Sequence, residues 1–327
     1  MVFAAATSQV YQTIISIMLV LTACGCFLVG VNLMSKGFVQ TTVRTNTFFT
    51  RGFCAKNRFR GAGAGLLYTA VVQSSDVTAV TLVRLADLGV ITLFQACACI
   101  IGANLGTTVT TFIVSLSSFN LTPYFAFLAF VGAIPMLSKR KNLRIFGEIV
   151  AGFGVLFIGI QLLDANMQND SFREFVKTIF NTTTNPLILI AIAAALTAVV
   201  QSSSVVTTMV VFLVSGSLLP IQSAFALIVG ANIGTCFTSW IASIGSSRTA
   251  RRVACFHTVF NLIGTALFIA VVYTPLNSYF FGMVDKLSIN VEFKVATFHL
   301  LFNLCASLVV IPLLRPVVWF CKKLVRH

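Results

Sequence analysis

The segment "TAVVQSSDVTAV" (Thr69–Val80) is nearly repeated as "TAVVQSSSVVTT" (Thr197–Thr208), 128 positions later. Both copies place Gln and Ser side chains in sequence that is otherwise almost entirely apolar. A second motif follows each copy at the same offset, because "IIGANLGTT" (Ile100–Thr108) corresponds to "IVGANIGTC" (Ile228–Cys236). We call these the QSS motif and the GAN motif. Their identical spacing in the two copies indicates an internal repeat.

The composition is that of a protein embedded in a lipid bilayer. Hydrophobic residues make up 57% of the 327 residues, charged residues only 9%, and the mean hydropathy is +0.97. A hydrocarbon core about 30 Å thick requires roughly 20 apolar residues per helix. The candidate membrane segments are 14–34, 89–116, 124–137, 145–163, 187–214, 217–244, 253–273 and 295–318. We therefore expect an all-α polytopic membrane protein.

The net charge of +14 comes from basic residues in the connections between apolar segments. This pattern orients membrane helices and does not indicate nucleic-acid binding. Basic residues dominate 35–60, 139–144, 248–252 and 315–327, so we expect these segments in the cytoplasm. The same rule predicts an external N-terminus and a cytoplasmic C-terminus, in a multi-pass protein of the inner (plasma) membrane.

The repeat also includes the helix before each QSS motif, since "GCFLVGVNLM" (Gly25–Met34) is similar to "GVLFIGIQLL" (Gly154–Leu163). The connection after the first of these segments is strongly basic, whereas 164–185 is acidic to neutral. Opposite charge bias predicts that the two copies are inverted in the membrane. We expect a first repeat at 1–138, a second at 139–247, and two scaffold helices at 248–327. Within each repeat we expect a re-entrant helical hairpin at the QSS motif and a broken helix at the GAN motif.

The polar residues of the two motifs are tolerable in a membrane only where they face protein or water. A Ser that caps a half-helix leaves backbone N–H groups that attract an anion. Oxygen atoms in the same turns suit a hard cation such as sodium. Inverted repeats with broken helices are typical of secondary transporters, in which two half-sites open alternately.

The residues resemble the type II sodium/phosphate cotransporters and their bacterial relatives. The resemblance covers about 25–303 and includes both QSS motifs, both GAN motifs and "RRVACFHTVFN". It implies import of inorganic phosphate by symport with sodium, with no organic cofactor and no enzymatic activity. Many bacterial relatives continue into a soluble regulatory domain, which we expect to be absent here. A homodimer is one oligomeric state that the sequence allows.

Carried over by position, the resemblance implies two overlapping sets of site residues. The expected phosphate site consists of Gln73, Ser74, Ser75, Gln201, Ser202, Ser203, Asn104 and Asn232. The expected sodium ligands are Ser75, Asp76, Thr107, Thr108, Ser203, Ser204 and Thr235.

Asp76 departs from the family pattern, which has Ser at this position, while Ser204 keeps that pattern in the second copy. Acids within membrane segments are by default ion ligands or proton carriers. Asp76 therefore leaves three alternatives open: sodium binding, proton coupling, or selection of a solute other than phosphate.

A shorter duplication relates "VACFHTVFNL" (Val253–Leu262) to "VATFHLLFNL" (Val295–Leu304). His257 and His299 are interpreted as hydrogen-bonded core groups of the scaffold helices. An intramembrane hydrolase using Ser74 or Ser202 with one of these histidines is disfavoured, because a hydrolase needs only one nucleophile. The nine cysteines lack disulfide or metal-site spacing and are expected in the core.

Overall fold

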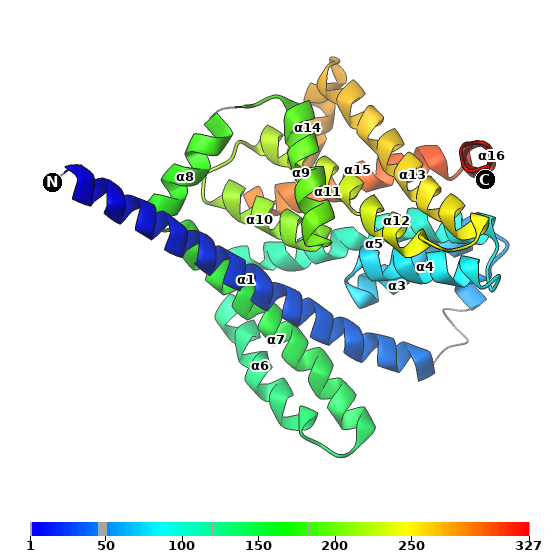
Figure 1. Cartoon of the computed structure of the whole chain (residues 1–327), viewed down its shortest axis with the longest axis horizontal. Helices are drawn as coiled ribbons and strands as arrows, with labels where there is room; N and C mark the ends of the chain where they lie inside the picture. The colour runs from blue at the N-terminus through cyan, green and yellow to red at the C-terminus, as the bar shows by residue number, and fades with distance from the viewer. Residues whose placement is uncertain (1, 45–50, 120, 182, 327) are drawn as a thin grey trace.

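The computed structural model describes residues 2–44, 51–119, 121–181 and 183–326, and the regular secondary structure of this part is entirely helical. The helices and the 3-10 helix η1 form one bundle (Figure 1). In chain order they are α1 (Val2–Arg44), α3 (Arg58–Val72), α4 (Ser75–Asp87), α5 (Leu93–Ser115), η1 (Leu116–Phe119), α6 (Thr122–Met136), α7 (Lys141–Met167), α8 (Asp170–Asn181), α9 (Pro186–Val200), α10 (Ser203–Ser215), α11 (Ile221–Gly234), α12 (Cys236–Ser243), α13 (Arg248–Val272), α14 (Leu276–Lys286), α15 (Val291–Val310) and α16 (Leu314–Leu324).

Within the described residues, six helical segments are long and apolar enough to cross a membrane, which confirms the predicted class. They are Val10–Thr41, Leu93–Phe119, Lys141–Met167, Ile221–Ser243, Arg248–Val272 and Val291–Val310. Three of the predicted segments differ from single spans. The stretch 187–214 forms two helices, 295–318 is divided between α15 and α16, and 124–137 lies in the 15-residue helix α6.

Both QSS motifs interrupt a helix at the same residue type and divide arms of equal length. Gln73 and Gln201 adopt left-handed backbone angles, with φ of 57° and 54°, and end helices of 15 residues. Helices of 13 residues, α4 and α10, follow after one Ser. We call α3–α4 hairpin 1 and α9–α10 hairpin 2. The predicted interruption at both motifs is confirmed.

The first arm of each hairpin packs closely on the GAN helix that follows it. A Cβ atom at Gly102 of α5 would lie 1.7 Å from the Ala62 carbonyl oxygen of α3. A Cβ atom at Gly230 of α11 would lie 2.2 Å from the Ile190 carbonyl oxygen of α9. Both contacts join residues that are equivalent at the offset of 128. Only Gly permits this approach, so the motif glycines set the position of each hairpin arm.

The two GAN helices differ, and this corrects one prediction. Helix α5 continues without a break through Asn104, Thr107 and Thr108, because the backbone keeps its helical hydrogen bonds there. In the second copy α11 ends at Gly234 and α12 begins at Cys236. The single residue between them, Thr235, retains right-handed helical angles. The expected unwinding is therefore absent from the first copy and limited to one residue in the second.

Helices α1 and α7 pack antiparallel through reciprocal glycine contacts. A Cβ atom at Gly30 would lie 2.2 Å from the Leu156 backbone nitrogen, and one at Gly159 would lie 2.5 Å from the Phe27 backbone nitrogen. At the repeat offset of 129, Gly30 corresponds to Gly159 and Phe27 to Leu156, so the two contacts are equivalent. At one end of the pair, Glu148 accepts a hydrogen bond from Gln40 (2.9 Å) and lies 3.6 Å from Lys36 Nζ. Glu148 is thus paired although it is buried.

Long-range hydrogen bonds gather several chain segments at one end of the bundle. Asp87 accepts a hydrogen bond from the Ser247 backbone (2.7 Å), and Arg58 donates to the carbonyl oxygens of Ile311 and Pro312 (3.1 Å each). The beginning of α13 and the end of α15 therefore both lie at the base of hairpin 1. It follows that α13 and α15 run in opposite directions.

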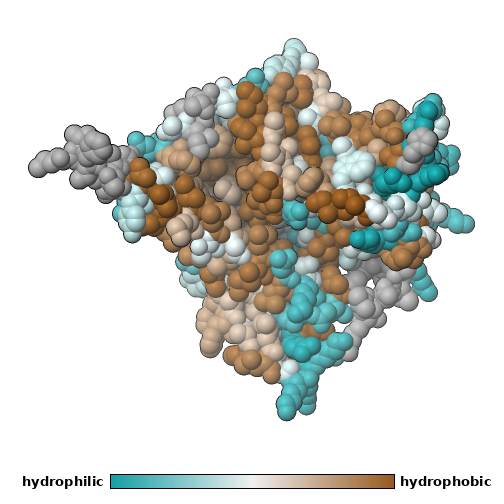
Figure 2. Space-filling model, viewed as in Figure 1, coloured by the Kyte–Doolittle hydropathy of each residue, from teal (hydrophilic) through white to brown (hydrophobic). Residues whose placement is uncertain are grey.

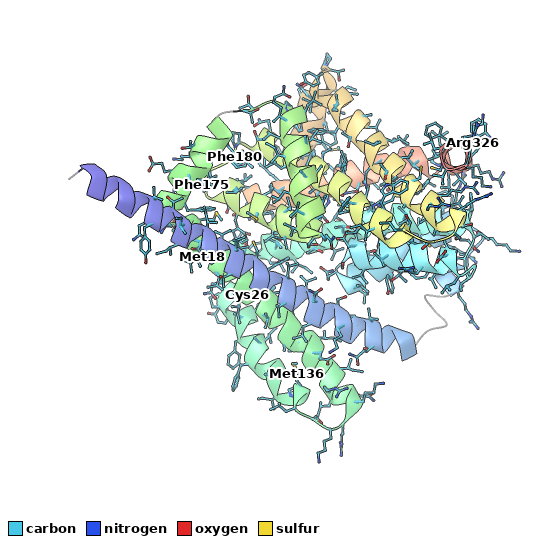
Figure 3. The ribbon with its side chains drawn as sticks, in the orientation of Figure 1. Met18, Cys26, Met136, Phe175, Phe180 and Arg326 are labelled. Atoms are coloured by element: carbon cyan, nitrogen blue, oxygen red, sulfur yellow. The ribbon has the colours of Figure 1, made fainter. Side chains whose placement is uncertain are left out.

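The surface is largely apolar between its hydrophilic edges. Figure 2 shows hydrophobic residues across most of the visible face and hydrophilic residues near the α6–α7 connection and the C-terminus. Phe127 and Phe130 of α6 are 61% and 64% exposed. Helix α8 instead turns Phe172 and Val176 into the core, and Phe175 and Phe180 lie along it above α1 (Figure 3). Such an exposed apolar surface is expected where lipid is the solvent.

Candidate functional site

The tip of hairpin 1 is a buried turn with a capped helix start. Gln73 is 4% exposed, its Nε2 donates to the Ala70 carbonyl oxygen, and its Oε1 has no hydrogen-bond partner among the described residues. The Ser74 hydroxyl accepts a hydrogen bond from the Val77 backbone (3.2 Å) and caps α4. Ser75 follows in the first turn and is buried. The tip thus presents the positive end of a half-helix beside a free amide oxygen.

The tip of hairpin 2 repeats this backbone with fewer side-chain contacts. Gln201 is exposed, and Ser202 at the start of α10 makes no capping hydrogen bond through its side chain. The buried Ser203 hydroxyl has no partner in the described part of the chain. The Ser203 and Ser204 carbonyl oxygens accept hydrogen bonds from Thr207 (2.9 Å) and Thr208 (2.6 Å).

Asp76 connects hairpin 1 to the other half of the molecule. Its Oδ1 accepts a hydrogen bond from the Thr238 hydroxyl of α12 (2.7 Å), and it forms no ion pair with any described residue. The same hydroxyl lies 2.6 Å from the Thr235 carbonyl oxygen, although it has one proton to donate. An ionised Asp76 can accept a hydrogen bond from the Thr238 hydroxyl. A protonated Asp76 can instead donate to the Thr238 oxygen, which leaves the Thr238 hydroxyl free to donate to the Thr235 carbonyl oxygen. The geometry therefore accommodates both charge states.

The polar residues of the GAN helices point their donors at their own backbones. Asn104 and Asn232 donate to the carbonyl oxygens of Ile100 and Ile228, both at 2.9 Å. The hydroxyls of Thr107, Thr108 and Thr235 likewise donate to carbonyl oxygens three or four residues earlier, at 3.0, 2.8 and 2.6 Å. This arrangement leaves hydroxyl and amide oxygens as acceptors, which is the chemistry that a hard cation requires.

Each hairpin packs on the GAN helix of the opposite copy as well as on its own. Helix α4 contacts α12, and α10 contacts α5. Through the first of these contacts, Asp76 of hairpin 1 lies beside Thr238 of the opposite copy. No hydrogen bond joins the Gln or Ser side chains of one tip to those of the other, among the residues described.

Several buried oxygen and nitrogen atoms of the hairpins and of the helices packed on them lack partners in the described structure. The side-chain atoms are Gln73 Oε1, Thr110 Oγ1, Thr197 Oγ1, Ser203 Oγ, His257 Nε2, Asn261 Oδ1 and Asn303 Oδ1. Leaving buried polar groups unpaired costs free energy, so such groups mark places for ions, polar ligands or water. Most of these atoms are oxygens, and they come from both hairpins and from α5, α13 and α15.

Each of the two histidines contacts a GAN helix, which was not predicted from the sequence. His257 Nδ1 lies 2.7 Å from the Ser239 hydroxyl of α12, and His299 Nδ1 lies 2.8 Å from the Thr111 hydroxyl of α5. Both imidazoles are 1% exposed. Ser239 and Thr111 occupy equivalent positions at the offset of 128, a signal that was present in the sequence. The interpretation as hydrogen-bonded core groups is confirmed.

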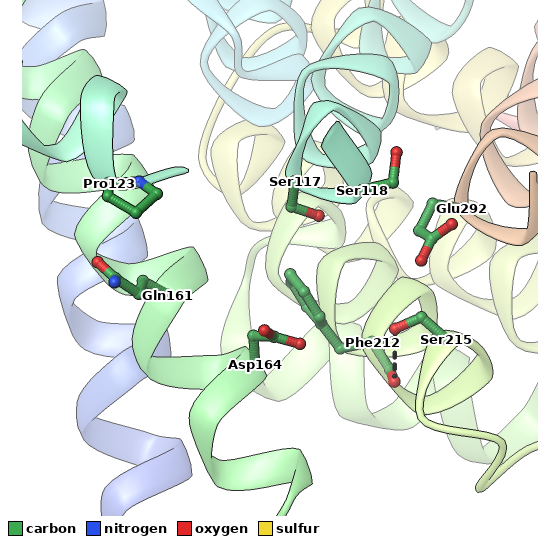
Figure 4. A pocket seen from close by; sticks show the side chains of 8 residues that line it. All are labelled: Ser117, Ser118, Pro123, Gln161, Asp164, Phe212, Ser215 and Glu292. Carbon is green, nitrogen blue, oxygen red and sulfur yellow. Dashed lines mark hydrogen bonds between the residues drawn. The ribbon is translucent and has the colours of Figure 1, made fainter. Parts of the chain in front are cut away.

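A polar cavity of about 360 Å³ lies beyond the end of α5 (Figure 4). Asp164 of α7 and Glu292 of α15 face it together with Ser215 at the end of α10. Its other lining residues are Ser117, Ser118, Pro123, Gln161 and Phe212. None of these residues was predicted as part of a site, because they come from η1, α6, α7, α10 and α15, and the sequence does not reveal that these elements meet.

Comparison with known proteins agrees with the motifs. The family model of the Na+/Pi-cotransporters matches residues 26–165 and 162–284. YjbB of Escherichia coli (strain K12), whose name describes inorganic phosphate export, is 25% identical over 94% of this chain and 55% of its own length. YqeW of Bacillus subtilis (strain 168), an uncharacterized protein, is 25% identical over 88% of this chain and 91% of its own.

The human sodium-dependent phosphate transport protein 2B is 34% identical over 32% of this chain and 16% of its own length. This chain thus spans about half the length of the YjbB proteins that it matches. No solved structure matches the chain. The family is one of cotransporters and not of enzymes, as the sequence predicted. Because its model covers most of the sequence, the chain belongs to the Na+/Pi-cotransporter family.

Proposed function

We propose that this protein transports inorganic phosphate coupled to sodium, by alternating access to a site formed between two inverted repeats. The observation that carries the proposal is the pair of hairpins, which break at equivalent Gln residues and begin their second arms with equivalent Ser residues. Each tip directs a helix N-terminus into an interior that contains unpaired buried oxygens. An anion and a hard cation would satisfy these two kinds of group together.

The inversion of the repeats is supported by two antiparallel pairs of equivalent segments. Helices α1 and α7 make reciprocal contacts at the repeat offset, as a two-fold axis between them would require. The equivalent segments of α13 and α15 also run in opposite directions. On this basis we retain the units 1–138, 139–247 and 248–327, and the assignment of the end of the bundle near Asp87 to the cytoplasm.

For phosphate, the proposed ligands are the backbone N–H groups at the starts of α4 and α10 with the side chains of the two tips. Gln73, Ser74, Ser75, Gln201, Ser202, Ser203, Asn104 and Asn232 remain the proposed set. No described Lys or Arg is hydrogen-bonded to these groups. Because neutral donors alone balance little of the charge of a phosphate dianion, a bound cation is needed to offset it.

For sodium, the proposed ligands are Ser75, Asp76, Thr107, Thr108, Ser203, Ser204 and Thr235. Asp76 supplies a full negative charge that the equivalent Ser204 does not. The hydrogen bond between Asp76 and Thr238 also leaves proton coupling as a second candidate, because it accommodates the protonated acid. A less charged solute in place of phosphate is the third outcome that an experiment must separate.

The test is transport of labelled phosphate by purified protein in proteoliposomes. Sodium and pH gradients are imposed separately and in both directions, since a secondary transporter runs in the direction that its gradients dictate. We expect accumulation of phosphate driven by an inward sodium gradient, and efflux when that gradient is reversed. Transport driven by the pH gradient alone would favour the proton alternative. Absence of phosphate movement under every gradient would contradict the proposal, and competition by other anions would then identify the substrate class.

A further inference from the structure

The two buried histidines occupy equivalent places but differ in their second hydrogen bond. His299 Nε2 lies 3.4 Å from Asn232 Nδ2, so this imidazole connects Thr111 on α5 to Asn232 on α11. His257 connects in the same way to Ser239 on α12. Its Nε2, however, is buried and has no partner in the described structure.

The residue that would complete the second connection follows from the repeat offset. Asn232 corresponds to Asn104, and His299 corresponds to His257 in the shorter duplication. The counterpart of the contact between His299 and Asn232 is therefore one between His257 and Asn104. Helix α13 packs on α5 as α15 packs on α11, so the two helices required are already neighbours. In this structure the Asn104 amide nitrogen donates to the Ile100 carbonyl oxygen.

In a transporter built from inverted repeats, the two halves exchange roles when access changes from one side of the membrane to the other. A contact made in one half in one conformation is then expected in the other half in the opposite conformation. Resting on the alternating access proposed above, we infer that His257 and His299 are paired positioning residues that exchange their contacts with the two GAN asparagines. In the conformation described here His299 holds Asn232, and in the alternate conformation His257 holds Asn104.

This exchange gives each conformation one contact between a GAN asparagine and a scaffold histidine, in place of two held permanently. It also accounts for the unpaired Nε2 of His257, which acquires its partner only when the conformation changes. The asparagines are proposed phosphate ligands, so the exchange would couple the position of the binding residues to the state of the scaffold.

The test introduces metal bridges that trap one contact at a time. Asn232→Cys places a thiol beside His299, and Asn104→Cys would place one beside His257 in the alternate conformation. Cys and His are both Zn²⁺ ligands, so Zn²⁺ stabilises whichever conformation brings each pair together. At a concentration about 100-fold above its Kd, Zn²⁺ changes the ratio of the two conformations by up to about 100-fold.

The readout is the rate at which a membrane-impermeant maleimide labels Ser215→Cys, which lines the polar cavity. The partly exposed native cysteines Cys26, Cys54 and Cys305 are first replaced by Ser. No phosphate is added, so the result does not depend on the substrate assignment. We expect Zn²⁺ to change the labelling rate in opposite directions in the Asn232→Cys and Asn104→Cys variants.

Two controls establish that the bridge is responsible. The protein carrying only the reporter should not respond to Zn²⁺, and neither should Asn232→Cys combined with His299→Ala. If Asn104→Cys does not purify as a folded protein, Asn104→His combined with His257→Cys makes the same bridge. The inference is overturned if Zn²⁺ moves both variants in the same direction, or if it leaves the pair at 104 and 257 unaffected.

Discussion

Hairpins 1 and 2 have the same backbone but are held differently. In hairpin 1 the arms are joined by a hydrogen bond between the Thr69 and Thr78 hydroxyls (2.9 Å), and Asp76 ties the second arm to α12. In hairpin 2 the residue equivalent to Thr78 is Val206, and the Thr197 hydroxyl is left without a described partner. The same motif thus forms a tied tip in one half and a less tied tip in the other.

The duplicated residues thus determine the backbone geometry of the hairpins, whereas the residues that differ between the copies determine how many side-chain hydrogen bonds hold each hairpin in place. Gln73 is buried and Gln201 is exposed in the same backbone conformation. In the conformation described here, Gln201 is therefore the motif glutamine that is accessible at the surface of the bundle.

The largest effect is expected from the glycines that determine the hairpin positions. Gly102→Ala places a Cβ atom 1.7 Å from a carbonyl oxygen, and Gly230→Ala places one at 2.2 Å. Overpacking of this kind typically costs about 1–3 kcal/mol or more. Both variants should show reduced yields of folded protein and a lower Tm in detergent. Gly63→Ala is the matched control, because nothing lies within 4 Å of its Cβ position.

Next in size is the effect of removing either motif Gln. We expect Gln73→Ala and Gln201→Ala each to lower the initial rate of phosphate transport by roughly ten-fold or more, as loss of a hydrogen bond to a charged ligand does. Gln73→Asn and Gln201→Asn are the controls, since Asn tolerates the left-handed backbone and keeps an amide. Normal transport by either Ala variant would contradict a site formed by both tips, because it would show that one tip is sufficient.

A change in coupling, more than in rate, is expected at Asp76. Asp76→Asn should weaken the sodium dependence of transport if the carboxylate binds the ion, because the full charge is lost. Asp76→Ser makes the two copies alike at this position and should keep transport while altering the charge moved per cycle. Transport is measured as a function of sodium and pH, with current recorded in parallel. Unchanged sodium dependence, pH profile and charge in both variants would exclude a direct role for Asp76.

The smallest effect is expected at the base of hairpin 1. The Ser247 backbone N–H donates to Asp87 at 2.7 Å and lowers the pKa of this carboxyl. Because the pKa of Asp87 is lower in the folded state than in the unfolded state, the contact stabilises the folded protein at pH values above the unfolded-state pKa. This stabilisation is lost as the pH falls through the folded-state pKa. Asp87→Asn should therefore lower the Tm slightly at pH 7 and have no effect at a pH below the folded pKa. An equal shift at both pH values would contradict this account of the contact.

Much of the fold could be predicted because polar residues in apolar sequence have few physical outcomes. The hairpin tips at Gln73 and Gln201 were predictable, since an intramembrane Gln-Ser-Ser requires a break or a polar interior. The continuity of α5 was not, because Thr107 and Thr108 can satisfy their hydroxyls on an intact helix as well as in an unwound one. Local sequence does not distinguish these two outcomes.

The candidate site was predictable where the residues repeat at a single offset, and not where it depends on contacts between the two halves. The bond from Thr238 to Asp76 joins residues 162 positions apart. The contact of His299 with Thr111 spans 188 positions. Such pairs are fixed by how α12 packs on α4 and α15 on α5, which a single sequence does not state. The polar cavity between Asp164 and Glu292 was missed for the same reason.

Inversion of the two copies in the membrane is tested most directly by measuring the topology with cysteine labelling. Lys56 precedes hairpin 1 and Gln168 follows α7, and both side chains are exposed. In a background without reactive native cysteines, Lys56→Cys should react with an impermeant maleimide only from the cytoplasmic side, and Gln168→Cys only from the external side. Labelling of both cysteines from the same side would contradict the account.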